Sequence, residues 1–446
     1  MKNILIVFAL LFGLKTEAQI NNSKEITTNP TMHNVGFITL LTHYYEDGLK
    51  LNPLNATFQG DYRYNDILPN FLSSDYKKEM KNYYSSYLDK SKKFEKAKLS
   101  ESERMSYAIL KWECEINLES LEFENYTPID QMWSMNLMIG QLAGGSSAQP
   151  FKTVEDYDNW LERLDDYVVW LKSTKTQMEV GMKAKNVLPK SLIIKVLPQL
   201  ASVADTELES NLFYTPIHNF PIEFTESEQA RLTSDYTTLI TNKIIPTYKE
   251  LHDFMANEYM NAGRESSGIQ DVPNGDAYYA HQIKLYTTTI LNASEIHEIG
   301  LKEVARISSE MEKVKEQVGF TGNLKDFFKE VRTKKELMPF TDPQQVIDNF
   351  NDIHKKMTPK INALFSKQPK TTFEVRRTEA FREASASAEY KIGQLKIMEL
   401  RSKAEARFGK DFDIKLFHEK ILETGCVPLA ILEDKMMNWI NPNTKF

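Results

Sequence analysis

Apolar residues recur at steps of three and four along almost the whole chain, and this spacing restricts the fold more than any other feature. Such steps place apolar side chains on one face of an α-helix, whereas a strand requires strict alternation. A clear run contains Val304, Ile307, Met311, Val314 and Val318. We therefore predict an all-α or nearly all-α protein, built as one large multi-helix domain.

Residue types that commonly begin or end helices occur at intervals along this pattern. Thr225 and Glu228 have the spacing of a capping box, in which two side chains satisfy backbone N–H groups at a helix start. Glycine and proline mark other boundaries because of their special backbone freedom and stiffness. We expect N-caps at Thr153, Thr225 and Ser294, a stop at Gly319, a break at Gly409, and a first helical residue at Pro428.

One segment departs from the helical pattern. Residues 371–377 alternate polar and apolar side chains and are rich in β-favouring types. Alternation of this kind is typical of a half-buried strand. We predict a minor β element at this segment.

The first residues have the layout of a secretory signal. Lys2 precedes the apolar run Ile4–Leu14, and Ala18 offers a small residue at the cleavage point. We expect a signal peptide over 1–18, a mature chain over 19–446, and a secreted or periplasmic location; the alternative is a buried N-terminal helix. No later stretch is long and apolar enough for a membrane span, so none is expected in the mature chain.

Charge and cysteine content limit the function further. The 446 residues carry a formal net charge of −7. A nucleic-acid partner is not expected, because phosphate binding requires clustered Lys and Arg. The two cysteines, Cys114 and Cys426, could pair in an oxidising compartment, but Cys114 lies on an apolar helical stripe and is expected to pack there as a free thiol.

The histidines do not form a recognisable metal motif. Helical zinc hydrolases place two histidines one turn apart with a glutamate beside the first. His297-Glu298 and His418-Glu419 open such a motif, but Leu301 stands at the position of the second histidine in the first pair. Leu422 stands there in the second pair. We expect no metal ligand and no catalytic residue from these positions.

Two clusters remain as candidates for ligand binding. Tyr278-Tyr279 follow a turn, and tyrosine hydroxyls at such a place can donate to a peptide carbonyl. Arg377 on the predicted strand, with Tyr390 and Lys391 beyond it, could hold a carboxylate. Ordinary packing of the tyrosines and ion pairing of the basic residues with nearby glutamates are the competing interpretations.

An ordered set of short segments resembles a bacterial family known as domain-of-unknown-function family 885, whose members are similar to helical zinc metallopeptidases. The resemblance covers nearly the whole mature chain, and it lies in the order of segments that are each weakly specific. The segments are 55–61, 65–69, 149–157, 187–190, 195–200, 274–279, 286–289, 295–301, 373–377 and 390–396.

The resemblance implies a zinc site that this chain lacks. In the family, a long segment with a histidine-glutamate metal motif and a later glutamate ligand lies between the counterparts of Arg377 and Lys391, which here are fourteen positions apart. The chain therefore looks internally truncated near 385–390, and no cofactor is expected. The resemblance retains Tyr278, Tyr279, Arg377, Tyr390 and Lys391 as substrate-facing candidates.

These observations leave several functional interpretations open. The first is a secreted relative of zinc metallopeptidases that acts on peptides in its family but is inactive here, a pseudoenzyme; its being an enzyme stays undecided. The alternative is a non-catalytic peptide-binding or interaction protein. A third is an unstable fragment, because helices that lose their packing partner expose apolar surface and promote association.

Overall fold

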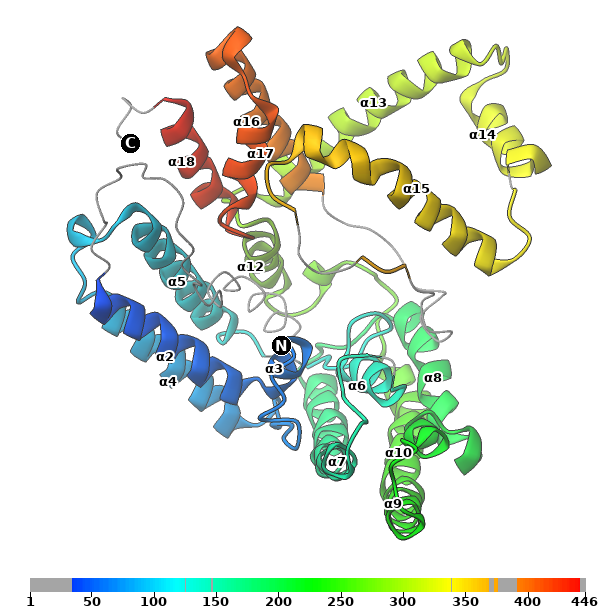
Figure 1. Cartoon of the computed structure of the whole chain (residues 1–446). Helices are drawn as coiled ribbons and strands as arrows, with labels where there is room; N and C mark the ends of the chain where they lie inside the picture. The colour runs from blue at the N-terminus through cyan, green and yellow to red at the C-terminus, as the bar shows by residue number, and fades with distance from the viewer. Residues whose placement is uncertain are drawn as a thin grey trace. The chain divides into compact units, whose positions relative to one another are not determined.

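The computed structural model describes residues 34–124, 126–145, 147–337, 339–368, 373–375 and 391–441, without the side chains of 391–393. These residues form helices joined by loops and short turns (Figure 1). The β pairing among them is one isolated bridge between Pro189 and Arg264. The all-α prediction is confirmed.

The chain divides into two compact units, Met1–His281 and Gln282–Phe446, with the boundary inside helix α12. The expectation of a single domain over 19–446 stays a prediction. The α-helices that lie in the first unit or begin there are α2 Val35–Leu51, α3 Pro53–Phe58, α4 Ser74–Ser91, α5 Glu101–Ser120, α6 Met135–Ala143, α7 Val154–Lys183, α8 Lys190–Ala204, α9 Glu226–Leu239, α10 Ile245–Phe254, α11 Met260–Ala262 and α12 Gly275–Thr287.

Helix α7 shows how the sequence determines the first unit. Thr153 and Asp156 form a capping box at its start, as predicted for Thr153. Its residues Trp160, Leu164 and Leu171 lie on one stripe and are fully buried. The α7 stripe packs with α9 and α10, while α2, α4 and α5 lie side by side in the same unit (Figure 1).

The segment from α9 to α11 runs as one helix with two widened turns. Ile240–Ile244 and Met255–Tyr259 adopt π-helical hydrogen bonding between the α-helical parts. Pro246 stands at the start of α10 and has no backbone N–H to offer the preceding turn. This missing donor accounts for the first widened turn. The capping box predicted at Thr225 and Glu228 begins the segment and is confirmed.

The second unit combines a small core with three poorly covered helices. The small core lies between α16, α17 and α18 and contains Leu400, Phe417 and Met436. Helices α13, α14 and α15 contain no buried residue among their described positions. The helices of this unit are α13 Ala293–Gln317, α14 Leu324–Thr333, α15 Pro343–Leu364, α16 Lys391–Phe408, α17 Ile414–Leu422 and α18 Leu429–Ile440.

Of the four helix boundaries predicted in the second unit, two are confirmed and two are corrected. Gly319 has φ +75° just after α13. Gly409, with φ +55°, follows the end of α16 and begins a 3-10 turn, as expected of glycine at these places. The N-cap of α13 is Asn292 rather than Ser294, because its side chain accepts from the N–H of Glu295. Pro428 is the N-cap of α18 rather than its first helical residue.

The predicted β element falls mostly outside the described residues. Within 371–377 only Phe373–Val375 are described, and they are irregular rather than in a strand. Both cysteines are free: Cys114 is buried on α5 and Cys426 is exposed. The packing prediction for Cys114 is confirmed.

Candidate functional site

Two of the five predicted site residues have described side chains. Tyr278 and Tyr279 lie in the first half of α12. Arg377 and Tyr390 lie outside the described residues, and Lys391 begins α16 with its side chain outside them as well. The predicted cluster of basic residues therefore stays a prediction, and the geometry of the site rests on the tyrosine pair.

The two tyrosines have different surroundings. The ring of Tyr278 meets the ring of Phe123 edge to face, with centroids 5.5 Å apart. Tyr279 is 46% exposed. Tyr278 thus packs as a helix-docking residue, the competing interpretation of the sequence, whereas Tyr279 can still offer its hydroxyl to a ligand.

His281 completes this part of α12 and was not among the predicted site residues. Its ring stacks on the ring of Phe123, with centroids 5.2 Å apart. The side chain is buried, with Nε2 2.7 Å from Ser120 Oγ and Nδ1 3.2 Å from Glu119 Oε1. We call Glu119, Ser120, Phe123, Tyr278 and His281 the α12 cluster. A serine, a histidine and a glutamate in line are the elements of a nucleophilic triad.

The position of Ser120 argues against such a role. Its hydroxyl also lies 2.9 Å from the carbonyl oxygen of Ile116, one turn back in α5, and donates to it. Ser120 is the last residue of α5, where the helix carries partial negative charge. An oxyanion forming there would be repelled, whereas a histidine N–H is attracted. The α12 cluster therefore attaches α12 to the end of α5 through His281.

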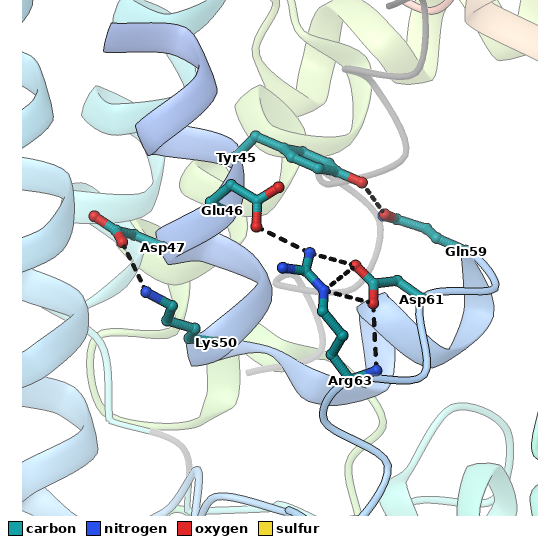
Figure 2. A network of polar contacts seen from close by, with 7 residues as sticks. All are labelled: Tyr45, Glu46, Asp47, Lys50, Gln59, Asp61 and Arg63. Atoms are coloured by element: carbon teal, nitrogen blue, oxygen red, sulfur yellow. Dashed lines mark hydrogen bonds and ion pairs between the residues drawn. The ribbon is translucent and has the colours of Figure 1, made fainter. Parts of the chain in front are cut away.

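A second polar cluster lies where α2 meets α3. Arg63 donates two hydrogen bonds to Asp61, from Nε to Oδ1 at 2.9 Å and from Nη2 to Oδ2 at 2.6 Å. Its Nη2 also donates to Glu46 Oε2 at 2.9 Å. Tyr45 donates its hydroxyl to Gln59 Oε1 at 3.1 Å. Figure 2 shows these side chains converging, with the separate Asp47–Lys50 pair on another face of α2. The carboxylates hold the pKa of Arg63 above its usual value.

A further polar side chain, Arg163 on α7, is fully buried. It donates to Thr57 Oγ1 at 3.0 Å, Gln149 Oε1 at 2.9 Å, the Tyr64 carbonyl at 2.6 Å and the Ile67 carbonyl at 3.2 Å. All of these acceptors are neutral. Burial lowers the pKa of Arg163 to about 10. Arg163 thus links, through hydrogen bonds, the segments near residues 57, 65 and 149, which are among those that resemble the family.

A buried carboxyl group, that of Glu113 on α5, lies among helices α2, α4 and α5. Glu113 is 2% exposed and accepts a hydrogen bond from the Tyr44 hydroxyl at 3.0 Å. Burial raises its pKa to about 8, and the Tyr44 hydrogen bond opposes part of that rise. The buried ring of Tyr83 stacks on that of Tyr44 and meets the ring of Tyr84 edge to face. Glu113 is therefore protonated at neutral pH.

The histidines of the described chain lie on different elements. His418 Nδ1 is 2.8 Å from the Leu364 carbonyl, and His218 Nε2 is 2.8 Å from the Glu209 carbonyl. His297 is exposed on α13. Within the described residues, no group of three or more His, Cys, Asp or Glu side chains is placed to hold a metal ion.

Comparison with known proteins gives the family. The model of the family described as "Bacterial protein of unknown function (DUF885)" matches residues 53–390 and 387–436. The chain belongs to this family. The two matched stretches of this DUF885 protein meet at 387–390. No curated protein matches the sequence.

Two solved structures have the same fold. A "putative lipoprotein" from Colwellia psychrerythraea matches with a TM-score of 0.78 and 15% identity, over 91% of this chain and 99% of that one. A "putative lipoprotein of unknown function" from Shewanella oneidensis matches with a TM-score of 0.58 and 11% identity, over 90% and 99%. Among the described helices, none has the length and apolarity needed to cross a membrane.

Proposed function

We propose that this DUF885 protein works outside the cytoplasm, binds peptides, and does not hydrolyse them. It is a relative of zinc metallopeptidases that has lost the metal centre. The signal-like N-terminus over 1–18 supports the location, as do the names of the Colwellia and Shewanella relatives. Lipoproteins are exported, so their structural likeness agrees with an exported chain.

The separation of the histidines is the observation that carries the proposal. A hydrolytic zinc ion needs several protein ligands within about 2.0 to 2.2 Å, commonly with two imidazoles on one helical face. Here His281 contacts Ser120 and Glu119, and His418 contacts a backbone carbonyl. These imidazoles are engaged in the fold on separate elements, which favours a protein without a catalytic metal.

The way the family model matches supports a missing segment. Residues 53–390 match as one stretch and 387–436 as another, and the two meet at 387–390. An internal deletion divides a match in this way. The junction coincides with residues 385–390, where the sequence places the absent metal-bearing segment.

Peptide binding would use Tyr279 of the first unit or, independently of it, the residues of the second unit that flank this junction. The exposed Tyr279 can donate its hydroxyl to a peptide carbonyl. Arg377 and Lys391 can pair with a terminal carboxylate, an interaction strengthened when both groups are charged. Tyr390 lies beside Lys391 in the sequence and would add an aromatic surface.

Metal analysis and peptide hydrolysis test the loss of catalysis. The mature chain purified with zinc in the buffer is expected to hold less than stoichiometric zinc and to leave a mixed peptide pool intact. Stoichiometric zinc together with hydrolysis that a chelator stops would refute the proposal.

Calorimetry with short peptides tests the binding. Arg377→Ala, Lys391→Ala and Tyr279→Ala should each weaken binding about tenfold, since each removes one polar contact worth about 1 to 2 kcal/mol. Arg407→Ala on α16 and Tyr62→Ala, both exposed, serve as matched controls and should bind as the parent does. Equal affinity in all five variants would remove these residues from the site.

A further inference from the structure

Several buried side-chain donors near Arg163 have no acceptor among the described residues. They are the amide nitrogens Nδ2 of Asn65 and Nε2 of Gln149 and the indole Nε1 of Trp160. Asn65 and Gln149 are each 1% exposed, and Trp160 and Arg163 are fully buried. Buried polar groups are almost always hydrogen-bonded, so these donors require an explanation.

Hydrogen bonds place the two amides beside the guanidinium. Arg163 Nη1 donates to Gln149 Oε1 at 2.9 Å and to Thr57 Oγ1 at 3.0 Å. The Thr57 hydroxyl in turn lies 2.6 Å from Asn65 Oδ1. Trp160 stands three positions before Arg163 on α7, so the two side chains are neighbours on the helix surface. We call Thr57, Asn65, Gln149, Trp160 and Arg163 the Arg163 cluster.

The direction of these bonds shows that the unused atoms are donors. A guanidinium only donates, so the Gln149 atom that contacts it is the oxygen, and the nitrogen of the same carboxamide is left over. The hydrogen bonds of Arg163 to four neutral acceptors also leave one further N–H of the guanidinium. The unused hydrogen-bonding capacity of the Arg163 cluster is therefore donor capacity.

The neighbouring helix α3 has the same surplus of donors. Asn55 Nδ2 on α3 and Gln59 Nε2 at its end lack an acceptor among the described residues, whereas the amide oxygens without a partner there belong to Gln131 and Gln199. Neither of these two is hydrogen-bonded to Arg163. Water both donates and accepts, so it would serve oxygens and nitrogens alike. A set of nitrogens is better matched by a ligand that only accepts.

The charge of Arg163 indicates that this ligand is an anion. Asp66 and Asp166 act on the guanidinium through space, without a hydrogen bond to it, and Asp166 Oδ2 accepts from the N–H of Leu68 at 2.9 Å instead. A buried charge is costly unless an opposite charge lies beside it. One monovalent anion balances Arg163, whereas a divalent anion would add an uncompensated negative charge.

From the surplus donors and the charge we propose that the Arg163 cluster binds one small monovalent anion of the chloride class. The anion accepts from the remaining N–H of Arg163 and from the amide nitrogens of Asn65 and Gln149. The burial of all three residues favours a single ion over the carboxylate of a peptide, which would need an opening to the surface. The site is independent of peptide binding, because none of the proposed peptide-binding residues belongs to the cluster.

Thermal unfolding of the full mature chain tests this site, with sodium gluconate exchanged for sodium chloride at constant ionic strength. A ligand that binds only the folded state stabilises it by mass action. The midpoint should therefore rise by about 2 °C or more for each tenfold increase in chloride above the dissociation constant. A midpoint that does not depend on chloride would overturn the proposal.

Gln149→Glu separates the site from a general effect of salt. The new carboxylate still accepts from Arg163 and supplies the negative charge within the chain, so the dependence on chloride should vanish. Gln270→Glu, at an exposed position of the first unit, is the matched control and should keep the dependence of the parent. Asn65→Asp applies the same test if Gln149→Glu does not fold, as judged by circular dichroism. A chloride dependence that survives in the folded variant contradicts the proposal.

Bromide locates the ion directly. Crystals grown without chloride and soaked in sodium bromide should give an anomalous diffraction peak within hydrogen-bonding distance of Arg163. Ordered water beside Arg163 in place of bromide would show that the cluster is hydrated, and the proposal would be wrong. Bromide bound only to exposed side chains would equally refute it.

Discussion

The two units bury similar amphipathic helices to very different extents. Helix α7 of the first unit places Trp160, Leu164 and Leu171 in a core with no exposure, whereas α13 of the second unit leaves Val304 63% and Val318 64% exposed. Both helices have capping boxes and regular apolar spacing. Helix formation and helix burial are therefore separate properties: local sequence determines whether the helix forms, and a packing partner determines whether it is buried.

The core of the first unit also contains polar groups that the second unit keeps at its surface. Arg163 and Glu113 are buried and hydrogen-bonded, while the charges of α13 and α15 face solvent. Buried polar groups constrain a fold strongly, because each lost partner leaves an unsatisfied group. Substitutions of matched residue types in the two units therefore test this difference in burial.

The largest effect is expected for Arg163. Arg163→Ala should lower the free energy of unfolding by about 3 to 5 kcal/mol, because it leaves a cavity and four acceptors without their donor. Arg332→Ala, an exposed arginine on α14, is the control and should change nothing measurable. Urea unfolding of both variants checks this. Equal stability of the two would show that the buried guanidinium does not hold the first unit together.

Glu113 gives the next effect, as a pH dependence. Its pKa is about 8 in the folded chain against 4.5 when unfolded, so between these values the folded state holds a proton that the unfolded state has lost. Stability from this group is complete below pH 4.5 and is lost as the pH rises through 8. The loss amounts to about 1.4 kcal/mol for each pH unit within this range.

Glu113→Gln should remove that slope, because the amide keeps a hydrogen-bond acceptor for Tyr44 and does not ionise. The exposed Glu115→Gln on the same helix should keep it. Thermal unfolding from pH 5 to 8 provides the measurement. A slope that survives in Glu113→Gln would mean that another group is responsible.

A pair of apolar truncations compares the two units directly. Leu164→Ala should cost about 2 to 4 kcal/mol of folding free energy, since Leu164 is fully buried. Val304→Ala should leave the unfolding of dilute protein nearly unchanged, because its side chain is already in water. Chemical denaturation at low protein concentration measures both. A large loss in Val304→Ala would show that α13 is packed within its own chain.

The smallest effect is expected at the exposed pair of Arg63 with Asp61 and Glu46. Arg63→Ala should cost less than about 1 kcal/mol, because water and salt screen the pair. Raising the salt concentration should shrink even that difference. A loss that is larger and independent of salt would indicate that Arg63 holds the turn through packing.

Much of the fold could be predicted from local sequence. Thr153, Thr225 and Gly319 act at helix ends as expected, because capping depends on neighbours within one turn. Asn292 takes the cap predicted for Ser294, since two capping side chains stand close together and only the three-residue spacing to Glu295 favours the first.

The candidate site was less accessible to sequence reasoning. Tyr278 and Tyr279 were predicted because a turn and two aromatic residues stand together. His281 and Arg163 were missed, because their partners Ser120 and Thr57 lie more than a hundred positions away in the chain. An isolated His or Arg within a helical pattern looks like a surface residue, and only tertiary structure reveals its burial.

Hydrogen exchange at several protein concentrations tests the central contrast between the two units most directly. Amides of α7 and α10 should be protected equally at every concentration, because their core lies within one chain. Amides of α13 and α15 should be less protected than those of α7 at every concentration, because the described positions of these two helices contain no buried residue. Equal protection of α13 and α7 would contradict the account.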